Sequence, residues 1–124
     1  DGVAKALPAL LRSHKLQKRA ARVGFEWPDS VGPLEKLKEE LAELDEAQTD
    51  EERLLEAGDV LFVAVNIVRR YGVDPEQALR ASNAKFERRF KVMEQLSENE
   101  GEDFAALDLE RQEEYWQRAK RETG

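Results

Sequence analysis

The stretch LEKLKEELAELDEAQTDEERLLEAGDVLFVAVNIV, residues 34–68, decides the fold. Its first part predicts an amphipathic helix over about 34–47, because leucines recur there at the spacing of one helix face. These are Leu34, Leu37, Leu41 and Leu44. Its second part predicts a helix from about Thr49 or Asp50 to Tyr71, apolar all round over 60–68 and therefore buried on several sides. A turn near 48–50 would make the two helices an antiparallel hairpin.

Three further helices are expected around this hairpin, and no strand. They cover about 3–23, 74–96 and 108–121, and two glycines and two prolines in 24–33 separate the first from the hairpin. The length of 124 residues suits one domain, 1–124. We therefore expect an all-α helical bundle of about five helices.

Composition excludes several classes of protein. There is no cysteine and only one histidine, His14, which excludes disulfide scaffolds, cysteine-ligated zinc and thiol catalysis. A net charge of −7 argues against a general nucleic-acid binder. The longest uninterrupted apolar run, 60–65, is far shorter than the roughly 20 residues of a membrane span. The absence of cysteine suits a reducing compartment, so we expect a cytoplasmic protein with no membrane partner.

Four carboxylates are predicted to converge within the hairpin. Glu40 and Glu43 are three residues apart, as are Glu56 and Asp59, so each pair shares a helix face. In an antiparallel hairpin turning near 48–50, Glu43 lies opposite Glu56 and Glu40 lies opposite Asp59. Clustered carboxylates near a core are costly unless a cation neutralises them. Oxygen ligands of this kind favour Mg²⁺.

The alternative is a solvated acidic face with ion pairs four residues apart, such as Lys36–Glu40. That alternative is preferred for four other acidic residues of the hairpin. These are Asp45, Glu46, Glu51 and Glu52.

The acidic spacing resembles the signature of the all-α nucleoside triphosphate pyrophosphohydrolases, and of the MazG family in particular. Glu40-x-x-Glu43 is followed, after twelve intervening residues, by Glu56-x-x-Asp59. The similarity also includes Asn83-x-Lys85-Phe86-x-Arg88-Arg89-Phe90, and it covers nearly the whole chain. The ending, residues 114–120, resembles the C-terminal domain of two-domain MazG proteins or a one-domain homologue.

The resemblance implies hydrolysis between the α- and β-phosphates, which gives a nucleoside monophosphate and pyrophosphate. It implies Mg²⁺, or Mn²⁺ in its place, at the four carboxylates, and a homodimer or higher homo-oligomer whose association completes a four-helix core. Many relatives have an acidic residue where this chain has Leu55. Glu39 then remains as a base or as a group supporting the metal ligands.

Other residues are assigned to the substrate. Phosphoryl transfer needs positive charge as well as metal, and Lys85 and Arg89 share one face of the 74–96 helix. The resemblance makes these two phosphate contacts and extends the nucleotide site to further residues. These are Gln17, Lys18, Asn83, Arg88, Trp116 and Lys120.

Two other functions stay open. One is an enzyme with a narrower substrate, such as dUTP, dCTP or an oxidised nucleotide. The other is a catalytically silent module that binds nucleotide or metal and serves oligomerisation or regulation. Housecleaning of non-standard nucleotides is the role that the resemblance suggests.

Overall fold

The computed structural model describes residues 2–124, and within them every regular element is helical, so the all-α class is confirmed. In chain order the elements are α1 (Ala9–Arg22), α2 (Val31–Glu46), α3 (Asp50–Arg70), α4 (Pro75–Asn99), a short 3₁₀ helix η1 (Phe104–Ala106) and α5 (Leu109–Thr123). Among these helices, none combines the length and the apolar character that crossing a bilayer requires.

Prolines move two helix starts away from their expected places. The first helix begins at Ala9 rather than near residue 3, because Pro8 is its N-cap and disfavours helical backbone at the residue before it. The second begins at Val31, three residues earlier than expected, and Pro33 lies in its first turn. A proline there costs no hydrogen bond, because the first N–H groups of a helix have no partner within it.

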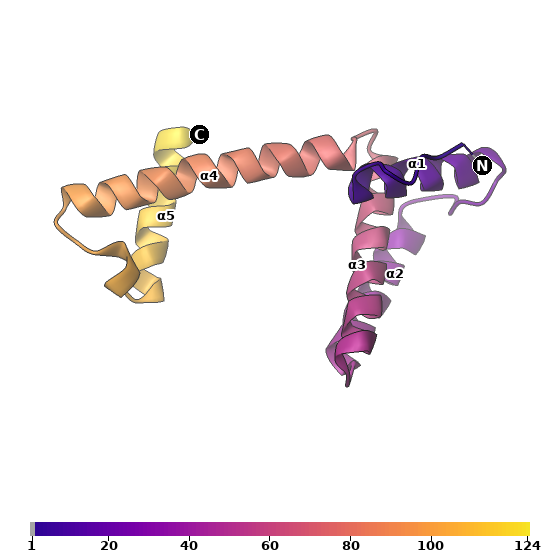
Figure 1. Ribbon diagram of the computed structural model, residues 1–124, viewed down its shortest axis with the longest axis horizontal. Helices are drawn as coiled ribbons and strands as arrows, with labels where there is room; N and C mark the ends of the chain where they lie inside the picture. Colours follow the sequence, from indigo (N-terminus) through magenta and orange to yellow (C-terminus); the bar gives the residue numbers. More distant parts are fainter. Residues whose placement is uncertain (1) are drawn as a thin grey trace. The chain divides into compact units, whose positions relative to one another are not determined.

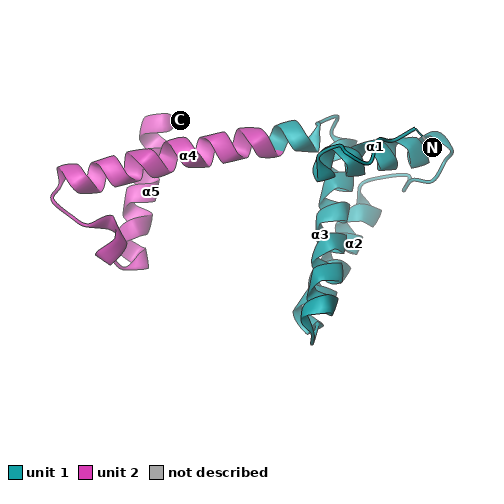
Figure 2. Ribbon diagram, in the orientation of Figure 1, with its two compact units in different colours: residues 1–78 teal, residues 79–124 magenta. Residues whose placement is uncertain are grey.

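The chain divides into two compact units, residues 1–78 and residues 79–124 (Figure 2). The first unit contains α1, α2, α3 and the first residues of α4, and the second contains the rest of α4, η1 and α5. The single-domain expectation stays a prediction.

In the first unit α2 and α3 lie side by side as an antiparallel hairpin, and α1 packs against α3 (Figure 1). Only Ala47–Thr49 connects the two hairpin helices. Thr49 is the N-cap of α3, and its side-chain oxygen accepts a hydrogen bond from the Glu52 amide at 3.1 Å. The Glu52 carboxylate in turn accepts from the Gln48 amide at 3.1 Å. This turn therefore fixes the register of the hairpin.

The third helix is mostly buried over residues 60–68, with one exposed apolar stripe. Val63 and Val65 are buried, whereas Leu61 and Phe62 remain 60% and 48% exposed. Because residues two apart in a helix point about 200° apart, Val63 and Val65 lie on different sides of α3. Burial on several sides therefore holds over 60–68 except at Leu61 and Phe62. An apolar stripe of this kind is a candidate contact surface.

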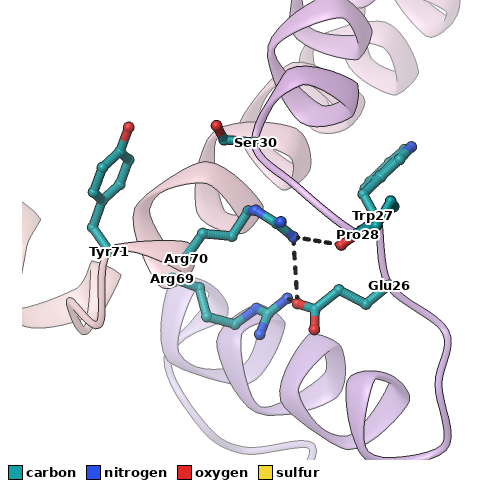
Figure 3. Close-up of a pocket in the computed structure, with 7 residues that line it drawn as sticks. All are labelled: Glu26, Trp27, Pro28, Ser30, Arg69, Arg70 and Tyr71. Atoms are coloured by element: carbon teal, nitrogen blue, oxygen red, sulfur yellow. Dashed lines mark hydrogen bonds and ion pairs between the residues drawn. The ribbon is translucent and has the colours of Figure 1, made fainter.

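The segment between α1 and α2 is held by ion pairs to the end of α3. Glu26 pairs with both Arg69 and Arg70, and Arg70 also donates to the Trp27 carbonyl at 3.1 Å (Figure 3). The Trp27 ring lies against Gly32, where a Cβ atom would come within 2.3 Å of the indole. These groups line a cavity of about 520 Å³ together with Pro28, Ser30 and Tyr71.

The second unit has its own small core. Met93, Tyr115 and Ala119 are buried, and Trp116 packs against them. The Tyr115 hydroxyl donates to Glu102. The guanidinium groups of Arg111 and Arg118 lie 4.7 and 5.2 Å from the centroid of the Tyr115 ring.

The turn between α2 and α3 gives the first prediction. Thr49→Ala removes the side-chain acceptor that caps α3, so we expect it to lower the free energy of unfolding by about 1 kcal/mol. Urea unfolding followed by circular dichroism measures this change. Ser82→Ala, at an exposed position within α4, is the control and should have little effect. Equal effects of the two substitutions would contradict the capping role.

Candidate functional site

Three of the predicted carboxylates meet between α2 and α3. Glu40, Glu43 and Glu56 each offer a carboxylate oxygen, and these three oxygens lie within 4.8 Å of one another. Glu40 is buried, and the other two are half-buried. The hairpin register derived from the sequence accounts for this meeting, because it places Glu43 opposite Glu56.

The charges of this carboxylate cluster (Glu40, Glu43 and Glu56) are compensated unevenly. The Lys36 ammonium lies 2.9 Å from a Glu40 oxygen. The hydrogen bond from Lys36 lowers the pKa of Glu40. No such cation acts on Glu43. Its pKa is raised to about 7, first by the hydrogen bond with Glu40 and then by burial and by the charges of Glu40 and Glu56. The cluster therefore holds a proton near neutral pH.

The cluster fits a divalent cation. With Glu43 ionised, Glu40 Oε2 and Glu56 Oε2 are buried acceptors without a hydrogen-bond donor. A buried acceptor in that state is costly, and a hard cation with oxygen ligands removes the cost. The three residues able to hold a metal are therefore Glu40, Glu43 and Glu56.

The fourth predicted ligand lies outside this group. Asp59 is exposed on α3, and Glu40, which the register places opposite it, is engaged by Lys36. Glu39 is exposed on α2 with its carboxylate 3.5 Å from the same ammonium. Leu55 is 62% exposed. The ligand role of Asp59 and the auxiliary role of Glu39 remain predictions.

The predicted cationic residues belong to the second unit. Arg89 and Trp116 come together there, with the guanidinium 5.5 Å from the indole centroid. The Arg89 Nε also donates to Thr123 Oγ1 at 3.4 Å. The other candidates in this unit are exposed. They are Asn83, Lys85, Arg88 and Lys120.

Two predicted substrate residues of α1 differ in their surroundings. Gln17 is buried, and its amide nitrogen donates to the Phe62 carbonyl at 3.0 Å. Lys18 is exposed.

Two sets of ion pairs in the first unit lie outside the site predicted from the sequence. The sequence indicates Lys36 only as part of the solvated alternative, yet its ammonium lies 2.9 Å from Glu40 of the carboxylate cluster. Its spacing of four residues from Glu40 was the available signal. The contacts of Glu26 with Arg69 and Arg70 join positions 43 and 44 residues apart, which no local pattern indicates.

The raised pKa of Glu43 gives the second prediction. Its folded value of about 7 exceeds its ordinary 4.5, so the folded protein binds this proton more tightly. The resulting stabilisation is complete below pH 4.5 and is lost as the pH rises through 7. We expect the metal-free protein to lose stability between pH 5 and pH 8, and Glu43→Gln to reduce that loss.

Urea unfolding in a chelating buffer at both pH values measures the difference between the two proteins. Adding Mg²⁺ at pH 8 should stabilise the unsubstituted protein more than the variant. An identical pH dependence in the two proteins would contradict the assignment of this proton to Glu43.

Comparison with known proteins places this hairpin within a family. A family model described as dATP/dGTP pyrophosphohydrolase matches residues 24–95, more than half of the chain. The chain is 46% identical over 114 residues to a Thermotoga maritima protein named nucleoside triphosphate pyrophosphohydrolase/pyrophosphatase MazG. That match covers 92% of this chain and 45% of the relative. An Escherichia coli nucleoside triphosphate pyrophosphohydrolase is 41% identical over 98% of this chain and 48% of its own length.

A Bacillus subtilis protein, YabN, is 43% identical over 97% of this chain and 25% of its own length. The chain thus spans about half the length, or less, of these relatives. The matched residues contain all of α2 and α3, including the carboxylate cluster. The chain therefore belongs to the MazG-like dATP/dGTP pyrophosphohydrolase family.

Proposed function

We propose that the protein hydrolyses nucleoside triphosphates between the α- and β-phosphates and releases a nucleoside monophosphate and pyrophosphate. The observation that carries this proposal is the carboxylate cluster of α2 and α3, with its two buried acceptors that lack donors. The names of the T. maritima and E. coli relatives support the same reaction.

Mg²⁺, with Mn²⁺ as a substitute, is the proposed metal, because Glu40, Glu43 and Glu56 offer oxygen ligands only. When bound, it would neutralise these carboxylates, hold phosphate oxygens and favour deprotonation of a water. In the overall reaction, a water oxygen bonds to the α-phosphorus, the bond to the bridging oxygen breaks, and pyrophosphate leaves. Glu43 must release its proton for all three carboxylates to act as ligands, so activity should fall below about pH 7.

Two acidic neighbours have supporting roles in this proposal. Asp59 is the fourth metal ligand, one helical turn after Glu56, and its exposed carboxylate is accessible to an incoming ion. Glu39 is a base or supports the ligands from α2, beside Lys36. Leu55 provides no carboxylate, which gives Glu39 more weight in this chain.

The third prediction tests the metal ligands. Glu40→Gln, Glu43→Gln or Glu56→Gln removes a negative ligand with little change in shape, so we expect hydrolysis to fall at least about a hundredfold. Phosphorus NMR of a mixed triphosphate pool, with Mg²⁺ and then with chelator, follows the products. Glu46→Gln, an exposed position on the same helix, is the matched control and should keep full activity.

Each outcome of the NMR experiment is informative. Monophosphate and pyrophosphate seen only with Mg²⁺ supports the proposal. Orthophosphate and diphosphate would mean that attack occurs at another phosphorus. Stabilisation by Mg²⁺ and nucleotide without turnover would instead favour a silent binding module.

We further propose that the second unit supplies positive charge and a stacking surface to the substrate. Lys85, Arg89 and Lys120 would balance the charge of the phosphates, with Arg88 and Asn83 as neighbouring contacts. Trp116 would contact the base or ribose, and Gln17 and Lys18 would contact the nucleotide from α1. The contact of Arg89 with Trp116 supports a joint role for these two residues.

The fourth prediction concerns the cations of α4. Lys85→Met and Arg89→Met should each lower kcat/KM by about tenfold to a thousandfold, because each removes a charge that stabilises the transferring phosphoryl group. Steady-state release of pyrophosphate measures the loss. Lys91→Met is the control, because Lys91 is an exposed lysine of the same helix that pairs with Glu87. Loss of activity in Lys91→Met to the same extent would contradict a specific role.

We also propose that the protein works as a homodimer in the cytoplasm. Leu54, Leu55, Leu61 and Phe62 leave an apolar surface exposed on α3, and a second copy of the chain would cover it. Such a pairing completes the four-helix core that the resemblance implies. The substrate is a free nucleotide, and the proposal includes no nucleic acid or membrane partner.

A further inference from the structure

Tyr115 is the side chain that anchors α5 within the second unit. Tyr115 and Ala119 are the buried residues of this helix, and both are fully buried. The Tyr115 hydroxyl donates to a carboxylate oxygen of Glu102 and accepts a hydrogen bond from Arg111 at 3.3 Å. A buried hydroxyl that loses its partners is costly, so these bonds hold α5 to the segment that precedes it.

Glu102 lies in that segment, between α4 and η1, and is held there by Arg111. An oxygen of the carboxylate and a nitrogen of the guanidinium are 2.6 Å apart. The hydrogen bond from Arg111, followed by that from Tyr115, lowers the pKa of Glu102, so its carboxylate is ionised at neutral pH. An ionised acceptor makes stronger hydrogen bonds than a neutral one. Glu102 therefore gives Tyr115 a charged partner that is itself fixed.

The ring of Tyr115 is also held by several neighbours. The guanidinium groups of Arg111 and Arg118 lie 4.7 and 5.2 Å from its centroid, where a cation is attracted to an aromatic ring. Arg118 is in turn paired with Glu100, with nitrogen and oxygen 2.6 Å apart. Phe104 contacts the ring edge-on, with the two centroids 6.4 Å apart. The rotation of α5 about its own axis is therefore fixed at Tyr115.

Trp116 directly follows Tyr115, and its direction depends on the same rotation. Successive residues of a helix point about 100° apart, so a fixed Tyr115 sets the side of α5 from which Trp116 projects. On that side the indole meets α4, where its centroid lies 5.8 Å from that of Phe86 and 5.5 Å from the Arg89 guanidinium. If Tyr115 were released, α5 would be free to turn and to carry the indole away from these contacts.

We propose that Glu102 is a positioning residue for the nucleotide, because it fixes Tyr115 and thereby sets where the Trp116 indole lies. The inference rests on the proposed function, in which Trp116 contacts the base or ribose. A contact that is in place before the nucleotide arrives reduces the conformational entropy lost on binding. Loss of Glu102 therefore weakens nucleotide binding more than it slows the chemical step, which takes place at the phosphates.

Glu102→Gln tests this role, because the amide keeps the shape of the side chain but not the charge that Arg111 holds. We expect KM for dATP to rise about tenfold and kcat to change less than about threefold, since the affected contact is made equally in the ground state and the transition state. Glu102→Asp keeps the charge and should raise KM less. Tyr115→Phe should add little to Glu102→Gln, because the two groups act as one unit.

Two control variants separate positioning from a general loss of stability. Asp108→Ala removes the N-cap of α5, which accepts from the Arg111 amide at 2.9 Å, and leaves the contacts of Tyr115 in place. Glu98→Gln makes the same chemical change as Glu102→Gln at an exposed position of α4. Both should leave KM almost unchanged, although Asp108→Ala lowers the stability of the helix.

Fluorine NMR observes the indole without any need for turnover. The chain has two tryptophans, Trp27 in the first unit and Trp116 in the second, so labelling with 5-fluorotryptophan gives one signal from each unit. We expect Glu102→Gln to shift or broaden the Trp116 signal and to leave the Trp27 signal in place. Addition of dAMP without metal should shift the Trp116 signal of the unsubstituted protein, and Glu102→Gln should require more dAMP for the same shift.

The outcomes separate this inference from the proposed function. Turnover of dATP with an unchanged KM in Glu102→Gln, with an equal rise in Asp108→Ala, or with an unmoved Trp116 signal would overturn the inference and leave the pyrophosphohydrolase intact. Turnover of no triphosphate, with a Trp116 response to dAMP that Glu102→Gln weakens, would overturn the proposed function and support the positioning role. Absence of both turnover and a Trp116 response to dAMP would overturn the two together.

Discussion

The mutual repulsion of three carboxylates is the constraint on which the first unit depends. Glu40, Glu43 and Glu56 are brought together by the hairpin of α2 and α3, and the turn between these helices fixes its register. Lys36 compensates part of the charge, and a proton near Glu43 compensates another part. Each compensation is replaceable, since a proton leaves as the pH rises and a lysine side chain can turn to solvent. The arrangement therefore lowers folding stability while it gathers oxygen ligands that could hold a cation.

The two units differ in how much of their apolar surface they bury. The first unit buries few large side chains, and α3 exposes leucines and Phe62 along one side. The second unit instead surrounds Tyr115 with its own small group of apolar residues. Burial of the exposed stripe against a second chain would add apolar area of the kind that stabilises folded proteins at about 25 cal/mol per Å². Stability and assembly would then be linked, so that dilution weakens both.

Features that depend on residues close together in the sequence could be predicted, whereas contacts between distant segments could not. The helix class, the hairpin and the meeting of Glu43 with Glu56 follow from periodicity and one short turn, and all three are present in the structure. The start of α1 was missed because Pro8 outweighs the leucine pattern on either side of it. The pairing of Glu26 with Arg69 and Arg70 was missed because it depends on the packing of distant segments.

The length of α3 has a consequence for the distance between two of its polar residues. Glu56 and Asn66 lie ten residues apart on this helix, and a rise of 1.5 Å per residue separates them by about 15 Å along its axis. A helix of this length is stiff, so that spacing is set before any molecule arrives. Glu56 belongs to the carboxylate cluster, and Asn66 is a buried amide nearer the other end of the helix. The spacing between these two polar groups is therefore a property of the helix itself and does not depend on how its side chains pack.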